Sequence, residues 1–206
     1  MGIIYRNAVK EDAPVMARLV EIASGGFIHF LFHDLIPGSS PLKIVEHGLG
    51  SDEEPYTWRN AVVAESQGKV IGISLSYPSS YHRITPGMEA FIPAERLDHV
   101  RKYYDARVED SWLIESLALF PEYHNRGVGS RLIDLTRKRA RERGYPSLSL
   151  LVYTDNVAAQ RLYFRHGFLV VRQVDLGSHE YIPHEEGCLL MKCPLENTGK
   201  IQVNRW

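Results

Sequence analysis

One short loop carries residues whose types and spacing suit the binding of an anion. It reads HNRGVGS, from His124 to Ser130, and lies between an apolar run at 111–120 and a segment with helical spacing. The N-terminus of a helix presents unpaired backbone N–H groups and the positive end of the helix dipole. Glycine lets the backbone curl closely around an anion. We therefore expect this turn to bind phosphate, with glycines that only serve packing as the alternative.

The spacing excludes the two common nucleotide-binding loops. A Walker loop ends in Gly-Lys followed by Ser or Thr, and this loop has no such ending. A dinucleotide-binding fingerprint has a third glycine three residues after the second, where Leu132 stands instead. The phosphate must therefore belong to another class of ligand.

A second motif begins about 25 residues after the loop and reads TDNVAAQRLYFRHGF. Together with HNRGVGSRL, it resembles the acetyl-CoA-dependent N-acetyltransferases related to Gcn5, the GNAT superfamily. That family shows Asn-x-x-Ala-x-x-x-Tyr and then a Gly-Phe pair. The matching positions are Asn156, Ala159, Tyr163, Gly167 and Phe168. The resemblance is specific over roughly 111–171, and upstream it extends only to the order of the elements.

The resemblance implies an α/β (α+β) fold. Its centre would be a mixed, mostly antiparallel sheet of about six or seven strands flanked by helices, with the fourth and fifth strands splayed apart. Because ~100–200 residues suit one domain, we expect a single domain over 1–206, with an insertion at 78–110 and a short C-terminal tail at 195–206.

Hydrophobic periodicity and turn residues place the elements along the chain. Strands are predicted at 3–8, in a hairpin at 60–77, and at 111–120, 147–153, 168–175 and 187–193. Helices are predicted at 13–23 after a cap at Asp12, at 94–108, at 127–144, and at 155–167 after a cap at Asp155 or Asn156. The region 25–54 gives no clear pattern, and within it only 25–38 is predicted to be helical in part.

The resemblance also implies acetyl-CoA as the co-substrate and no metal. The pyrophosphate would lie on the loop formed by His124, Asn125, Arg126, Gly127, Val128, Gly129 and Ser130. The pantetheine arm would pair with the fourth strand at Leu117, Ala118 and Leu119, beside Ala159 and Tyr163, and Asn156 would bind the arm or cap its helix. His124 departs from the Arg or Gln usual in the family. The departure predicts weaker binding rather than none, with Arg126 supplying the fixed charge.

Two side chains are candidates for proton transfer. Tyr163 matches the acid that the family uses to protonate the thiolate of coenzyme A; the alternative is a helix tyrosine that packs on the sheet. Strand alternation puts Glu115 on the same side as Leu113, Leu117 and Leu119, where desolvation would suit a general base acting through water. The alternatives are a carboxylate paired with an arginine, or a strand bulge that turns it elsewhere.

Composition narrows the function further. The chain has 206 residues, a formal net charge of −1 and a sequence pI of about 6.8, which disfavours nucleic-acid binding. The basic run 137–143 is expected to be a solvated helix face. Without a long apolar stretch or a secretory core near the N-terminus, we expect no membrane partner and a cytoplasmic location. Cys188 and Cys193 should point to opposite faces of one strand, without a disulfide.

The predicted reaction is transfer of acetyl to a primary amine on a small molecule or a peptide. The acceptor site would be built from 25–54, 78–110 and the loop at 179–188. His29 and His33 are expected in aromatic packing or in the wall of that site rather than on zinc. A homodimer is possible. The alternatives are a regulator that binds coenzyme A without turnover and an interaction domain that keeps only the fold.

Overall fold

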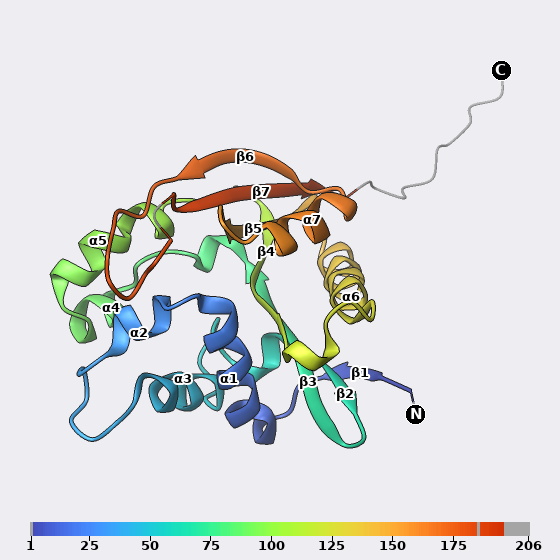
Figure 1. The fold of residues 1–206 in the computed structure, drawn as a ribbon, viewed down its shortest axis with the longest axis horizontal. Helices are drawn as coiled ribbons and strands as arrows, with labels where there is room; N and C mark the ends of the chain where they lie inside the picture. Colours follow the sequence, from blue (N-terminus) through green and yellow to red (C-terminus); the bar gives the residue numbers. More distant parts are fainter. Residues whose placement is uncertain (1, 185, 196–206) are drawn as a thin grey trace.

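A computed structural model describes residues 2–184 and 186–195. Its centre is a seven-stranded sheet with the order β1-β2-β3-β4-β5-β7-β6 (Figure 1). All neighbouring strands are antiparallel except β4 and β5, which are parallel. The strands are β1 (Ile4–Asn7), β2 (Ala61–Ser66), β3 (Lys69–Pro78), β4 (Ser111–Leu119), β5 (Ser147–Tyr153), β6 (Leu169–Val174) and β7 (Cys188–Pro194). The predicted mixed sheet of six or seven strands is confirmed.

Seven helices of the described chain flank the sheet. They are α1 (Ala13–Ser24), α2 (Phe27–Phe32), α3 (Pro41–Leu49), α4 (Pro86–Phe91), α5 (Ala94–Tyr104), α6 (Val128–Glu142) and α7 (Val157–Arg165). The sequence did not predict α3 or α4. Both begin in the same way, because Ser40 and Thr85 accept hydrogen bonds from backbone N–H groups three residues on and a proline follows each. This cap-and-proline pattern is a helix-start signal.

The helices form a layer on each face of the sheet. On one face, α1 and α3 pack on β2 and β3 through a core that includes Met16, Leu19 and Leu49. On that side α2 and α5 continue the layer toward β7 (Figure 1). On the other face, α6 and α7 pack through Leu132, Ile133 and neighbouring residues. The hydrophobic stripe predicted on 127–144 therefore faces the sheet, as its helical spacing requires.

The splayed strands that the sequence predicted are present between β4 and β5. These strands pair only between Ser111 and Ile114 on β4 and Ser147 and Leu150 on β5. Beyond Ile114, β4 continues to Leu119 without a partner on that edge in the described chain. The split leaves one row of backbone N–H and C=O groups of β4 open, and it lies beside the N-terminus of α6 (Figure 1).

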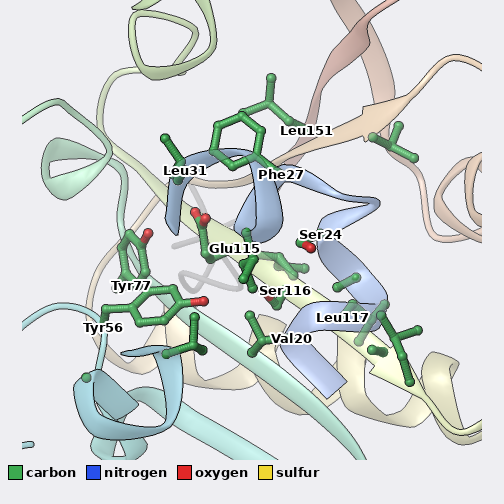
Figure 2. A pocket seen from close by; sticks show the side chains of 18 of the residues that line it. Val20, Ser24, Phe27, Leu31, Tyr56, Tyr77, Glu115, Ser116, Leu117 and Leu151 are labelled. Atoms are coloured by element: carbon green, nitrogen blue, oxygen red, sulfur yellow. The ribbon is translucent and has the colours of Figure 1, made fainter. Parts of the chain in front are cut away.

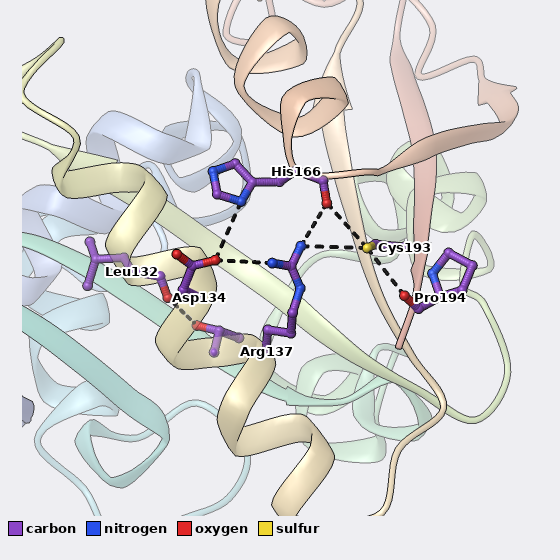
Figure 3. A network of polar contacts seen from close by, with 7 residues as sticks. Leu132, Asp134, Arg137, His166, Cys193 and Pro194 are labelled. Atoms are coloured by element: carbon purple, nitrogen blue, oxygen red, sulfur yellow. Dashed lines mark hydrogen bonds and ion pairs between the residues drawn. The ribbon is translucent and has the colours of Figure 1, made fainter. Parts of the chain in front are cut away.

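The basic run 137–143 is a solvated face only in part: Lys138, Arg141, Glu142 and Arg143 are exposed, but Arg137 and Arg139 are half-buried. Arg137 donates to the carbonyl of His166 and pairs with Asp134, which ties α6 to the turn after α7 (Figure 3). Arg139 donates to the side-chain oxygen of Asn7 on β1 at 2.7 Å. These arginines hold elements together, and the helix keeps its exposed charges at other positions.

Three smaller expectations can be compared with the structure. Cys188 and Cys193 are free buried thiols, and they lie in separate core clusters on opposite faces of β7, as alternation predicted. Asp12 precedes α1, but its carboxylate accepts hydrogen bonds from Arg6 and from the N–H of Val9 instead of capping that helix.

Among the described helices, none has the length and apolarity to cross a membrane. Of the predicted tail, 196–206 lies outside the described residues.

Candidate active site

The loop before α6 has the conformation that an anion site needs. Gly127 and Asn125 both have positive φ, at 77° and 58°, and Gly127 is the residue at which the chain turns into the helix. The N–H groups of Val128, Gly129 and Ser130 belong to the first turn of α6, where a helix offers no acceptor of its own. The first turn also carries no acidic side chain. This end of α6 is therefore a positively polarised seat for a negatively charged group.

The two basic side chains of the loop are already engaged. The Nε2 atom of His124 lies 3.1 Å from the carbonyl oxygen of Leu119, so the imidazole holds the loop against the end of β4. The guanidinium of Arg126 lies over the ring of Tyr123, 5.5 Å from its centroid. That Arg126 supplies the fixed charge in place of His124 stays a prediction. In this structure the backbone N–H groups supply the anion seat.

The motif on α7 is placed as its spacing predicted. The side-chain oxygen of Asn156 accepts from the N–H of Ala159 at 3.1 Å and so caps the helix. Tyr163 lies one turn further along, with its ring 5.6 Å from that of Phe168. Its side chain is almost wholly buried, and burial raises the pKa of the hydroxyl well above its usual range. The phenol therefore stays protonated at every physiological pH.

Glu115 lies on a bulge of β4, which corrects the sequence-based placement. On β3, Leu75 faces Ser116 and the next residue, Ser76, faces Ile114, so Glu115 has no partner in the ladder. The bulge shifts the alternation of β4 by one residue. Leu117 and Leu119 consequently pack toward α6, while Glu115 turns to the opposite side of the sheet. The expectation that it shares a face with Leu117 and Leu119 was wrong, and the alternative of a strand bulge that turns it elsewhere is confirmed.

The carboxylate of Glu115 lies in an aromatic chamber. Figure 2 shows it near Tyr56, Tyr77 and Leu31. The pKa of Tyr77 is raised well above its ordinary value, first by burial and then by the charge of Glu115 and the hydrogen bond to it. The Glu115 side chain is only 16% exposed, and its Oε2 atom has no hydrogen-bond partner among the described residues. Oε2 is itself covered and faces His82, so a ligand in the cavity meets the part of the Glu115 side chain that remains exposed.

His82 is a site residue that sequence reasoning missed. Its side chain is fully buried, its Nε2 atom lies 3.0 Å from the carbonyl of Tyr103, and its Nδ1 atom lies 3.5 Å from Oε2 of Glu115. Because a carbonyl only accepts, Nε2 carries a hydrogen, and Nδ1 is the ring atom that faces the carboxylate. The 3.5 Å separation is too long for a strong hydrogen bond. No motif marks His82 in the sequence, since only the fold brings it to Glu115.

His29 and His33, which were expected in aromatic packing or in the wall of the acceptor site, lie in aromatic packing. The rings of His29 and His33 pack against that of Tyr181, each with its centroid 4.6 Å away. The Nε2 atom of His33 also meets the guanidinium of Arg96. This is the aromatic packing that the sequence favoured. Within the described residues, no group of three or more potential ligands gathers to hold a metal ion.

One cavity of about 1470 Å³ joins the loop, the strand split and the aromatic chamber. The sequence-predicted site residues that line it are Glu115, Leu117, Ala118, Leu119, His124, Asn125, Gly127, Val128, Gly129, Ser130, Asn156, Ala159 and Tyr163. Arg126 is the one predicted residue outside this lining. The cavity therefore runs from an anion seat, past an open strand edge, to a buried carboxylate.

Comparisons with known proteins agree with this arrangement. The model of the acetyltransferase (GNAT) family matches residues 32–168. An N-acetyltransferase from Staphylococcus aureus Mu50 has 22% identity and a TM-score of 0.62, with 92% of this chain and 98% of that one covered. No curated protein matches this chain.

Two further solved structures share the fold at lower identity. The ribosomal-protein-S18-alanine N-acetyltransferase of Escherichia coli has 17% identity and a TM-score of 0.58, with 100% of this chain and 99% of that one covered. The PaiA N-acetyltransferase of Thermoplasma acidophilum, solved in complex with coenzyme A, has 13% identity and a TM-score of 0.53, with 94% and 99% covered.

Proposed function

Because this chain belongs to the acetyltransferase (GNAT) family, we propose that it transfers an acetyl group from acetyl-CoA to a primary amine. The observation that carries the proposal is the single cavity that connects the N-terminus of α6 with Glu115 across the split between β4 and β5. A cofactor with a charged end and a long amide-bearing arm would fill that path. An acceptor would then meet the thioester beside the carboxylate.

The cofactor would be held mainly by backbone groups. Its pyrophosphate would accept hydrogen bonds from the N–H groups at the start of α6, from Val128 to Ser130. The amides of its pantetheine arm would pair with the open edge of β4 at 117–119, as an added strand does. The exposed guanidinium of Arg131, on the first turn of α6, is available to the 3′-phosphate.

The chemistry needs one proton acceptor and one proton donor. An alkylammonium ion has a pKa near ~10 and no lone pair, so Glu115 would take its proton, directly or through a water molecule. The amine nitrogen would then attack the thioester carbon, and a backbone N–H of β4 would stabilise the negative charge that develops on oxygen. As the C–N bond forms and the C–S bond breaks, the thiolate would take a proton from Tyr163. The extra proton on the newly bonded nitrogen would pass through water to the Tyr163 phenolate, which leaves a neutral amide and restores the phenol.

His82 would assist the step in which Glu115 holds a proton. Its Nδ1 atom faces Oε2 of Glu115, and its other nitrogen is occupied by the carbonyl of Tyr103. With Nδ1 unprotonated, a protonated Glu115 would donate to it after a small closing movement. His82 would thus accept a hydrogen bond from Glu115 once Glu115 has taken a proton from the amine.

Calorimetric titration of the purified protein tests the cofactor half of the proposal. Acetyl-CoA and desulfo-CoA should both bind in the micromolar range, while ATP, which lacks the arm, should bind at least tenfold more weakly. Release of free thiol that depends on added amine then tests transfer. Cofactor binding without release for any amine would favour the alternative, a coenzyme A-binding regulator. No cofactor binding would favour an interaction domain.

A further inference from the structure

The chamber around Glu115 has walls that are aromatic and uncharged. Besides Leu31, its lining includes Phe27, Tyr56, Tyr77, Tyr103 and Tyr104. Burial, followed by the charge of Glu115, raises the pKa of each of these four tyrosines well above the ordinary value. The hydroxyls therefore remain neutral. A ligand inside the chamber meets ring faces, ring edges and phenol groups.

Glu115 supplies the charge of this chamber. Other charged side chains that line the cavity, namely Lys43, Glu53, Glu54, Arg83 and Arg165, are exposed to solvent. Among the described residues, no Lys or Arg pairs with Glu115, and its Oε2 atom has no hydrogen-bond donor. A buried carboxylate whose hydrogen bond comes from the neutral phenol of Tyr77, with no Lys or Arg beside it, is costly. An ammonium group offers it both charge and donors, and aromatic faces attract cations further.

One side of the chamber is closed by direct contact between two loops. The turn after α1 meets the segment between β6 and β7 so closely that a Cβ atom at Gly26 would lie 2.0 Å from the carbonyl oxygen of Tyr181. His184 contacts the carbonyl of Gly25 at 3.0 Å, and Tyr153 donates to the carbonyl of Ser24 at 2.6 Å. A polypeptide chain has no room between these loops.

The cavity also has an apolar mouth. Ile36, Tyr81 and Phe91 line it and are 38%, 44% and 45% exposed. They come from the segment after α2, the segment after β3 and the end of α4. Large apolar side chains that remain exposed around a cavity commonly mark a binding surface. An acceptor with its ammonium group at Glu115 would place the rest of its body between the rings and this mouth.

We propose that the acceptor is a small arylalkylamine, bound as a single ammonium ion at Glu115 with its aromatic group against the tyrosine rings. This inference rests on the proposed transfer reaction and names its substrate class. A polyamine would bring further charges to a chamber with one buried anion. A free amino acid would bring its own carboxylate close to Glu115. A peptide would also need room for its chain, and none is left between the loops that meet at Gly26 and Tyr181.

Steady-state kinetics with three probe amines tests the class. Phenethylamine, spermidine and the N-terminal amine of a neutral tripeptide amide are compared at saturating acetyl-CoA. The value of kcat/KM for phenethylamine should exceed those for the other two by at least tenfold. Equal kcat/KM values for the three amines, or a higher value for spermidine or the peptide, would overturn the arylalkylamine class while leaving acetyl transfer established.

Calorimetry on the desulfo-CoA complex separates binding from turnover. Phenethylamine should bind, and Glu115→Gln should weaken it at least tenfold while the binding of 2-phenylethanol changes less than twofold. Unchanged desulfo-CoA affinity shows that the variant is folded. Amine binding without thiol release would support the acceptor class and contradict the proposed transfer. If phenethylamine does not bind, or Glu115→Gln weakens the amine and the alcohol equally, the inference fails.

Discussion

The Nδ1 atom of His82 lies 3.5 Å from Oε2 of Glu115, and the opposite nitrogen of the same ring is fixed by the carbonyl of Tyr103. Two segments far apart in sequence therefore place a ring nitrogen of His82 opposite a carboxylate oxygen of Glu115. Such a contact is most favourable when one proton lies between the two groups. In the proposed reaction, this is the state reached once Glu115 has taken a proton from the amine.

Glu115→Gln should lower kcat by about 100-fold, because general base catalysis typically contributes 10²–10⁴-fold. The glutamine has nearly the same shape, but its amide cannot take a proton from the amine. Acetyl-CoA affinity should change little, since the anion seat is at the other end of the cavity. Steady-state kinetics with a reactive amine checks the rate, and calorimetry checks the affinity. A variant with the wild-type kcat would remove Glu115 as the base.

Tyr163→Phe should lower kcat by about 100-fold with little change in acetyl-CoA binding, because it removes the hydroxyl that would protonate the thiolate. The ring and its contact with Phe168 remain, so the fold should be preserved. Turnover with a reactive amine and calorimetry with acetyl-CoA measure the two effects. Unchanged turnover would exclude Tyr163 as the acid.

The wild-type pH profile gives an independent check on Tyr163. The raised pKa of its hydroxyl means that the acid form persists above the usual tyrosine range. Loss of activity caused by its ionisation should therefore not begin below about pH 10. A descending limb of kcat near pH 9 that is absent from Tyr163→Phe would show that burial does not protect this proton.

Gly129→Glu should abolish cofactor binding, because a carboxylate at the first turn of α6 would occupy and charge the anion seat. A Cβ atom at Gly129 meets only Leu162 at 3.4 Å and Leu119 at 3.8 Å, so the helix itself can accept a side chain. Arg141→Glu is the matched control, since it changes charge at an exposed position near the other end of α6. Tight acetyl-CoA binding by Gly129→Glu would contradict the loop assignment.

The local motifs could be predicted from sequence because their geometry is set by neighbouring residues. The start of α6 at Gly127 and the Asn156 cap of α7 depend on contacts within a few positions, so spacing alone located them. The mixed sheet with split strands followed from the family resemblance carried by those motifs.

The acceptor chamber could not be predicted in the same way. The side of β4 that carries Glu115 depends on a bulge opposite Leu75 and Ser76, and nothing in the strand sequence marks the extra residue. His82 reaches the site only through the path of the chain after β3. In the sequence, a short helix such as α4 is indicated by its capping residue and the proline that follows rather than by hydrophobic periodicity.

Asp12→Asn should destabilise the protein near neutral pH by about 1–3 kcal/mol, a range typical of hydrogen bonds to charged groups. Burial raises the pKa of Asp12, but hydrogen bonds from Arg6 and the N–H of Val9, with the charge of Arg6, outweigh it and lower the pKa overall. The stabilisation is therefore present above pH ~4, the unfolded value, and is lost as the pH falls through the lower folded-state pKa.

Urea unfolding between pH 3 and 7 measures this effect. The difference between wild type and Asp12→Asn should shrink toward acid pH. Asp98→Asn is the control, because its pair with Arg101 is exposed and screened by solvent and should contribute little to stability. A pH-independent difference for Asp12→Asn would mean that the ion pair is not its source.

Amine-dependent release of coenzyme A from acetyl-CoA, with mass spectrometry of the acceptor, tests the central claim most directly. We expect thiol release with phenethylamine, an acetyl group on its nitrogen, and a decrease of both by about 100-fold with Glu115→Gln. If acetyl-CoA binds but neither phenethylamine nor any other primary amine becomes acetylated, the cavity is not an N-acetyltransferase active site.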